Sequence, residues 1–152
     1  IHLLAERYLL NDTNWKAGAM PVNLFSFNEI KPILESNIGK VFAIEAPLYS
    51  TKLRAAGRTD CIAEWNGIPS IIDFKTSRKP KKEEWIQGYF LQATTYALMM
   101  REMTGLEVDQ FAIVVAVDGS EPQVFVKSIA EFVPEVLRIF STYGMIVTKE
   151  VT

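Results

Sequence analysis

Two aspartates and a lysine lie within a short stretch of the sequence and are residue types suited to metal-assisted hydrolysis. Asp60 is followed thirteen residues later by Asp73, and Lys75 comes two residues after that. Carboxylate oxygens are hard ligands that suit Mg²⁺ or Mn²⁺. An ammonium group can offset the negative charge that develops in a transition state. Such chemistry requires that the chain bring the three side chains together.

The residues between the two aspartates predict a tight β-hairpin. Asn66-Gly67 favours a type I′ turn, because both central residues of that turn need a positive φ. With these two residues as the loop, Trp65 pairs with Ile68, and the numbers of all paired residues sum to 133. Asp60 is then expected directly opposite Asp73, in a closely spaced pair that exchanges no main-chain hydrogen bonds.

Side-chain alternation places Lys75 on the face of Asp73 and Arg58 on the face of Asp60. The Cβ atoms of directly opposite residues are about 5 Å apart, and like charges at that distance destabilise a sheet unless something compensates. A divalent cation is the natural compensation. The alternative is a surface hairpin in which Asp73–Lys75 and Arg58–Asp60 pairs neutralise each other. A bulge would also separate the two acids.

The remaining pattern predicts one α/β domain over residues 1–152, with a mixed central β-sheet flanked by helices. Strands are expected over residues 40–50, 53–65, 68–76, 108–117 and 123–128. Helices are expected over residues 1–10, 27–37 with Ser26 as N-cap, 83–103 before Gly105, and 130–147. Because the chain begins at Ile1 within a predicted helix, we expect an N-terminally trimmed fragment of a longer protein.

The composition of the chain excludes several classes of protein and of metal site. No apolar run reaches the roughly 20 residues that span a bilayer, and the single cysteine, Cys61, excludes an internal disulfide and a four-cysteine metal site. The net charge is −2, but residues 40–82 carry nine Lys or Arg against four acids, whereas residues 101–152 carry four against eight. The basic middle is suited to a phosphate backbone. A solvated charged loop at residues 78–84 is the alternative.

The order of the motifs resembles the PD-(D/E)XK nuclease superfamily. GRTD at residues 57–60, DFK at 73–75 and QATTY at 92–96 lie on the expected elements, and the resemblance runs from about residue 40 to 128 and weakly over the first helix. Within the superfamily the chain most resembles the RecB-like and phage exonucleases and the mitochondrial genome-maintenance exonucleases. The resemblance implies a restriction-endonuclease-like core and hydrolysis of DNA that depends on Mg²⁺ or Mn²⁺.

The resemblance also assigns roles in the reaction. It implies that Asp60, Asp73 and the carbonyl of Phe74 bind the metal, and that Lys75 positions or activates the attacking water. Glu45, in the first predicted strand, corresponds to an acid that assists the metal or its waters. A partly buried, paired structural glutamate is the alternative for Glu45.

Further site residues are expected around this centre. His2, the single histidine, matches a metal-ligating histidine on the first helix of RecB-like nucleases, although a surface or core histidine is the alternative. Gln92 and Tyr96 share a helix face, and in the family this face overlooks the active site; without the family they are an ordinary helix pair. The expected substrate contacts are Gln92, Tyr96, Arg58, Ser77 and Lys79. Trp85, Tyr89 and Phe90 either stack on unpaired bases or, for at least two of them, pack in the core.

The sequence therefore predicts a metal-dependent DNA exonuclease that acts from free ends. The alternatives are a structure- or site-specific endonuclease, a catalytically silent DNA-binding module on the same fold, and a plain α/β interaction domain. Relatives that carry an iron–sulfur cluster held by four cysteines are excluded by the cysteine count. We expect no membrane partner and a location in bacterial or phage-infected cytoplasm rather than the mitochondrion; the oligomeric state stays open.

Overall fold

The computed structural model describes the backbone of residues 1–151 and the side chains of residues 1–142. Five strands form one mixed sheet in the order β1-β2-β3-β4-β5, in which β3 and β4 are parallel and the other neighbours antiparallel. The strands are β1 Ile38–Ser50, β2 Ala55–Trp65, β3 Ile68–Ser77, β4 Gln110–Val117 and β5 Gln123–Ser128. The helices are α1 His2–Leu9, α2 Pro21–Asn37, α3 Gln87–Thr104 and α4 Val133–Val151, with 3-10 turns η1 Glu83–Trp85 and η2 Ile129–Glu131.

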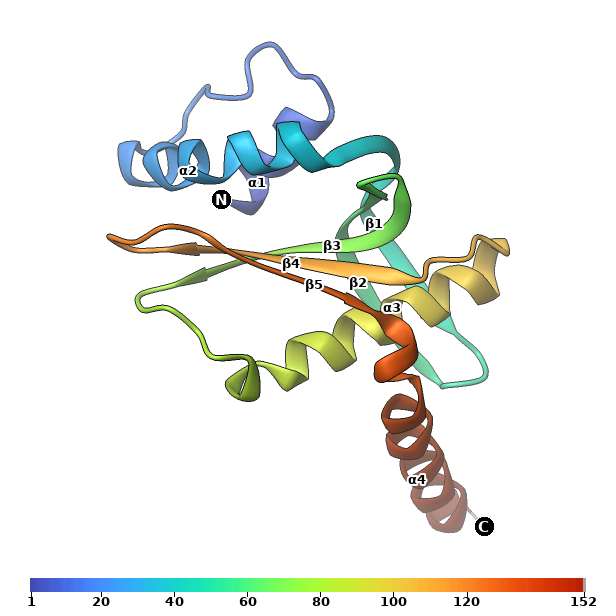
Figure 1. The fold of residues 1–152 in the computed structure, drawn as a ribbon. Helices are drawn as coiled ribbons and strands as arrows, with labels where there is room; N and C mark the ends of the chain where they lie inside the picture. Colours follow the sequence, from blue (N-terminus) through green and yellow to red (C-terminus); the bar gives the residue numbers. More distant parts are fainter. Residues whose placement is uncertain (152) are drawn as a thin grey trace.

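The sheet is covered on both faces, with α1 and α2 on one side and α3 on the other (Figure 1). Alternate side chains of β4 enter the two resulting cores: Phe111 stacks on Phe90 of α3 at 5.3 Å between ring centroids, whereas Val114 packs in the core that includes Phe27 of α2. A central strand buried on both faces explains the unbroken apolar run of β4. The predicted α/β class with a mixed sheet is confirmed. No helix in the described part of the chain combines the length and apolarity needed to cross a membrane.

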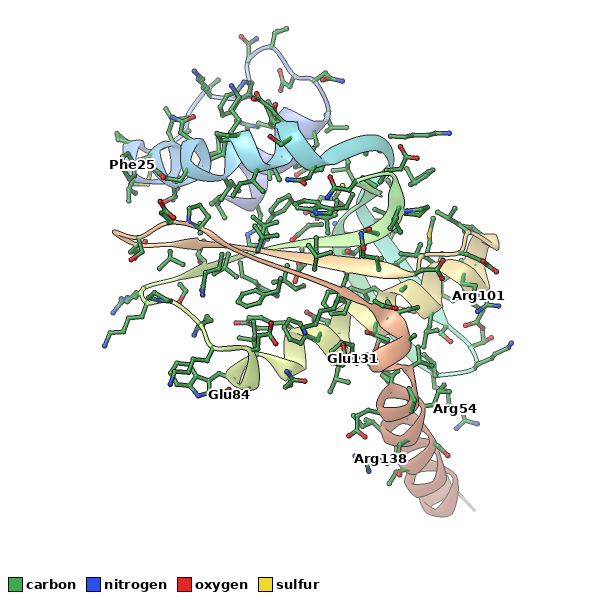
Figure 2. All side chains as sticks on the ribbon, viewed as in Figure 1. Phe25, Arg54, Glu84, Arg101, Glu131 and Arg138 are labelled. Carbon is green, nitrogen blue, oxygen red and sulfur yellow. The ribbon has the colours of Figure 1, made fainter. Side chains whose placement is uncertain are left out.

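Side chains fill both layers between the helices and the sheet, and the labelled Arg138 of α4 and Phe25 of α2 project outward (Figure 2). Phe25 is 66% exposed. The buried faces of α2 and α3 pack against the two faces of the sheet.

Several predicted boundaries were wrong. The second helix begins at Pro21 with Met20 as N-cap, not at Phe27 with Ser26 as N-cap. Proline is favoured in the first helical turn because its missing N–H would have no partner there, and the helix starts six residues earlier than predicted. The predicted long helix is divided: η1 ends at Trp85 and α3 begins at Gln87.

The β2–β3 hairpin has the predicted turn and register. Asn66 and Gly67 have φ values of 52° and 83°, as a type I′ turn requires. The paired residues run from Trp65↔Ile68 outward to Cys61↔Ile72. Every pair follows the predicted register, so the odd- and even-numbered residues of both strands face the predicted sides of the sheet.

This turn makes a prediction about stability. An added Cβ would contact nothing within 4 Å at either Gly67 or Gly88 of α3, but only Gly67 has a positive φ. Gly67→Ala should therefore lower the free energy of unfolding by about 1–2 kcal/mol. Gly88→Ala should leave it unchanged or raise it by up to about 1 kcal/mol. Urea denaturation of both variants measures the difference, and equal destabilisation would show that φ at the turn is unimportant.

Candidate active site

The β2–β3 ladder stops one pair before the two aspartates, after Cys61↔Ile72. In a continued ladder the N–H of Phe74 would pair with the carbonyl of Thr59. It donates instead to Oδ2 of Asp60, at 2.8 Å. The regular pairing predicted for Asp60 and Asp73 is therefore interrupted, because the Asp60 carboxylate lies in the gap between the two strands. Because the N–H and carbonyl of one strand residue point to the same side, the carbonyl of Phe74 also faces this gap.

The two carboxyl groups converge, as the hairpin predicts. The pKa of Asp60 is raised to about 8, chiefly by burial and next by a hydrogen bond with Asp73; the N–H of Phe74 opposes the shift, and the negative charges of Asp73 and Glu45 add to it. Only 16% of the Asp60 side chain and 12% of the Asp73 side chain are exposed. Two carboxylates this close hold a proton or a cation between them.

Lys75 lies beside this pair, on the predicted face. Its Nζ is 3.0 Å from Oδ2 of Asp73 and 4.7 Å from the ring centroid of Tyr89 in α3. The ion pair and the cation–π contact fix the position of the ammonium group, which is one quarter exposed. A positive charge is therefore held next to the two acids and within reach of solvent.

Glu45 has an unusual backbone conformation at a position opposite Asp60. The β1–β2 register on either side of Glu45 puts it opposite Asp60, and its φ is 50°, a left-handed conformation that costs a non-glycine residue about 1–2 kcal/mol. Its Oε2 lies 3.7 Å from Nη1 of Arg58. Arg58 therefore pairs with Glu45 and not with Asp60, while 64% of its side chain stays exposed.

His2 approaches Asp60 from the start of α1. Its Nε2 is 3.6 Å from Oδ2 of Asp60, and 51% of its side chain is exposed. Among the described residues, no group of three or more His, Cys, Asp or Glu side chains is arranged to hold a metal ion. The available donors are two carboxylates and a main-chain carbonyl, which suits a cation that keeps waters and takes its remaining ligands from a substrate.

Tyr96 of α3 packs against the start of the GRTD motif. A Cβ at Gly57 would lie 2.5 Å from Cε1 of the Tyr96 ring, so only glycine fits there without displacing the ring. The pKa of Tyr96 is raised by burial and then by the charge of Asp73, while the main-chain N–H of Arg58 and the charge of Lys75 oppose the shift. The phenol is therefore within the electrostatic reach of the candidate site.

Gln92 lies one helical turn before Tyr96 on α3. It is exposed and borders a pocket of about 310 Å³ between α3, the start of β2 and α4. Tyr96 lines the same pocket. No contact described for this part of the chain joins Gln92 to Asp60 or Asp73, so the structure brings Tyr96 but not Gln92 to the two acids.

Ser77 and Lys79 belong to a basic loop that follows β3. The hydroxyl of Ser77 donates to the carbonyl of Lys79 at 2.5 Å, and the loop surrounds an open hollow of about 470 Å³. The hollow is lined by Thr76, Ser77, Arg78, Lys79 and Lys81. Gln123 of β5 holds the main chain of Lys81 through two hydrogen bonds, of 2.7 and 2.9 Å. The basic side chains therefore extend from a loop anchored to the sheet.

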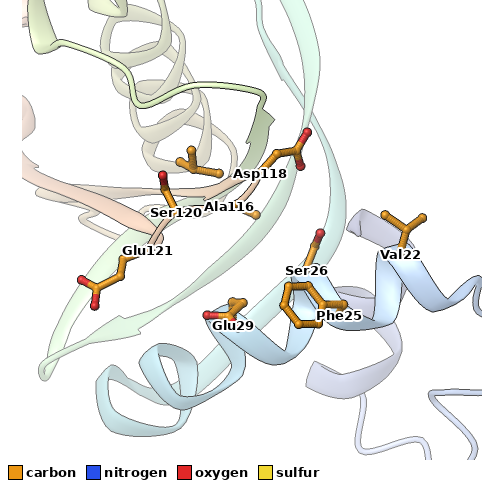
Figure 3. A pocket seen from close by; sticks show the side chains of 10 residues that line it. Val22, Phe25, Ser26, Glu29, Ala116, Asp118, Ser120 and Glu121 are labelled. Atoms are coloured by element: carbon orange, nitrogen blue, oxygen red, sulfur yellow. The ribbon is translucent and has the colours of Figure 1, made fainter.

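A second pocket, of about 630 Å³, lies between α2 and the turn that joins β4 to β5 (Figure 3). Its lining includes Glu29, Asp118 and Glu121, together with exposed apolar residues of α2, and neither Asp60, Asp73 nor Lys75. Acidic walls disfavour a phosphate backbone. The hollow beside the basic loop is lined instead by Arg78, Lys79 and Lys81.

Three features of the site were not found by sequence reasoning. These are the left-handed backbone of Glu45, the packing of Gly57 under Tyr96, and the contact of Tyr89 with Lys75. The seven-residue spacing of Tyr89 and Tyr96 puts both on one face of a helix and was the available signal. Nothing in the local sequence marks the backbone of Glu45.

Comparison with known proteins identifies a family and relatives of this chain. Residues 3–140 match the model of the PD-(D/E)XK nuclease superfamily. Mitochondrial genome maintenance exonuclease 1 of Homo sapiens is 35% identical over 91 residues, which cover 57% of this chain and 26% of that protein. The Mus musculus protein of the same name is 34% identical over 80 residues, or 53% of this chain and 23% of that protein. The chain thus spans about a quarter of the length of these relatives.

The fold has a counterpart among solved structures. The crystal structure of a candidate exonuclease from Eubacterium rectale superposes with a TM-score of 0.63 over 95% of this chain and 64% of that chain, at 15% sequence identity. This likeness supports the mixed sheet flanked by helices. The family match covers most of the chain and includes both aspartates and the lysine. The chain belongs to the PD-(D/E)XK nuclease superfamily.

Proposed function

We propose that this nuclease hydrolyses DNA at a divalent cation held by Asp60 and Asp73, with Lys75 as the neighbouring positive charge. The observation that carries the proposal is the convergence of two largely buried carboxyl groups beside a fixed ammonium group. Such a pair is unfavourable in an ordinary sheet. Its presence at the point where two strands part is explained by a cation between the carboxylates.

The residues present fit Mg²⁺ or Mn²⁺. Asp60, Asp73 and the carbonyl of Phe74 supply three hard oxygen ligands, which these cations prefer. Glu45 and His2 are near enough to Asp60 to contact metal-bound waters, and we assign His2 as a further ligand candidate. When bound, the cation lowers the pKa of a coordinated water and neutralises a phosphate oxygen.

The side chains around the carboxylates have separate tasks. Lys75, fixed by Asp73 and Tyr89, orients the attacking water and offsets the negative charge that builds on the phosphate. The 3.0 Å distance between its Nζ and Oδ2 of Asp73 holds the ammonium group beside the two acids. The substrate strand contacts Tyr96 above the carboxylates and Arg58 at the exposed edge, and its phosphates bind Ser77 and Lys79 of the basic loop. Gln92 contacts a neighbouring nucleotide.

Substitution of the two acids tests the reaction centre. Asp60→Asn and Asp73→Asn should each abolish metal-dependent cleavage, because each removes a charged ligand of the cation. Both variants should stay folded, since the change also relieves the repulsion between the carboxylates. Asp109→Asn, the same change at an exposed acid, is the matched control and should retain full activity. Cleavage at the wild-type rate by either active-site variant would exclude the assigned centre.

Within the same assay, Lys75→Ala should reduce turnover by on the order of 10²–10³-fold, the effect of deleting one transition-state stabiliser. Lys52→Ala, at an exposed lysine in the β1–β2 turn, controls for the loss of one positive charge. A loss below roughly fivefold would assign Lys75 to fold stability, because it would be far smaller than expected for a group at the reacting phosphate.

We further infer that cleavage starts at free DNA ends. The basis for this inference is that the names of the relatives include exonuclease activity. Linear single-stranded DNA should be digested under conditions in which a covalently closed circle of the same sequence survives. A circle that is cut as fast as the linear strand would identify an endonuclease instead.

A further inference from the structure

We propose that Trp85 is a stacking platform for an unpaired base of the DNA strand that enters the active site. This inference rests on the proposed function, because it assigns the substrate strand a path across the basic loop. It adds a base-binding position and a preference for unpaired nucleotides. The residue lies in η1, between the basic loop and α3.

The exposure of Trp85 separates it from the other aromatic residues nearby. Trp85 is 63% exposed, whereas Phe90 is fully buried and Trp65 is 2% exposed. Tyr89 is partly buried against the core and contacts Lys75. Of the three aromatic residues in this region that the sequence offers for stacking, Trp85 alone presents most of its surface to solvent. An exposed indole costs hydrophobic free energy, which a stacked base recovers.

One lysine lies over the exposed ring, and a basic hollow precedes it in the chain. Nζ of Lys82 lies 5.1 Å from its centroid, and the basic hollow at residues 76–81 precedes it in the chain. Single-strand-binding sites combine a positive groove for the phosphates with aromatic rings for the bases. Glu83 on the same turn is paired with Lys127 of β5 at 3.3 Å, which reduces its repulsion of phosphate.

The platform is held at a fixed position relative to the catalytic residues. Lys81 is bonded to Gln123 on one side of the turn, and Glu83 is bonded to Lys127 within it. Trp85 precedes Tyr89, the residue under Lys75, by four positions, across the short break between η1 and α3. Figure 2 shows Glu84, the neighbour of Trp85, at the outer surface beside the start of α3. Because four residues span at most about 14 Å, Trp85 stays near the residue that contacts Lys75, and a strand whose phosphate reaches Lys75 can extend over the ring.

A binding assay tests the platform. It measures the affinity of the full chain for a fluorescein-labelled oligothymidine, and the chain carries Asp73→Asn to prevent cleavage. Adding Trp85→Ala should weaken binding by on the order of 5- to 150-fold, the effect of losing one base–aromatic stack. Trp85→Phe should restore most of the affinity, because a phenyl ring still stacks. Glu84→Ala, a truncation of the exposed neighbour, should not weaken binding. Affinity for blunt duplex DNA should change much less with Trp85→Ala, since paired bases cannot stack on the ring.

An abasic scan separates stacking from a structural effect. With a single abasic nucleotide moved along the oligonucleotide, Trp85→Ala should cause no further loss at the one or two positions that lie over the ring. The same loss at every abasic position, or unchanged affinity of Trp85→Ala for the intact oligonucleotide, would overturn the platform. Because wild-type cleavage is measured separately, loss of the platform alone leaves the nuclease assignment intact. Absence of both binding and cleavage would overturn both.

Discussion

Electrostatic repulsion between two carboxylates is the constraint around which this structure is built. Asp60 and Asp73 are close enough to share a hydrogen bond, and burial together with that contact raises the pKa of Asp60 to about 8. Like charges directly opposite each other destabilise a sheet, and a one-residue slip in register would place one of them on the other face. Here the type I′ turn at residues 66–67 fixes the register, and the two helical layers bury both faces of the hairpin. The fold thus holds the acids together against their own charge, which gives a cation a place to bind.

The same elements serve stability and the site. Helix α3 buries Phe90 in the sheet core and, from the same surface, places Tyr89 under Lys75 and Tyr96 over Gly57. The β2–β3 ladder is regular from the turn to Cys61↔Ile72 and ends where Asp60 accepts the N–H of Phe74. This interruption of regular pairing lies within the site, as expected where local structure serves a reaction. A well-packed core supplies the stability that this local cost requires.

The sequence was most informative where local rules determine geometry. Turn chemistry at residues 66–67 and alternation along two strands placed Asp60, Asp73 and Lys75 on one face before any coordinates. Prediction was weaker elsewhere. The start of α2 at Pro21 has a local signal, a proline in the first turn. The partner of Arg58 and the left-handed φ of Glu45 depend on how β1 crosses β2. Such long-range effects have no signature within a short window of residues.

The central claim is that the carboxylate pair holds a divalent cation, and calorimetric titration with Mn²⁺ tests it directly. Wild-type protein should bind Mn²⁺, whereas Asp60→Asn and Asp73→Asn should bind it much more weakly. Because the pKa of Asp60 is raised, the cation must displace a proton at neutral pH; affinity should therefore increase as the pH rises toward about 8 and then level off. Proton release, seen as a dependence of the measured heat on the buffer, should accompany binding. Equal affinity in the wild type and both variants, or no binding to the wild type at any pH in this range, would contradict the account.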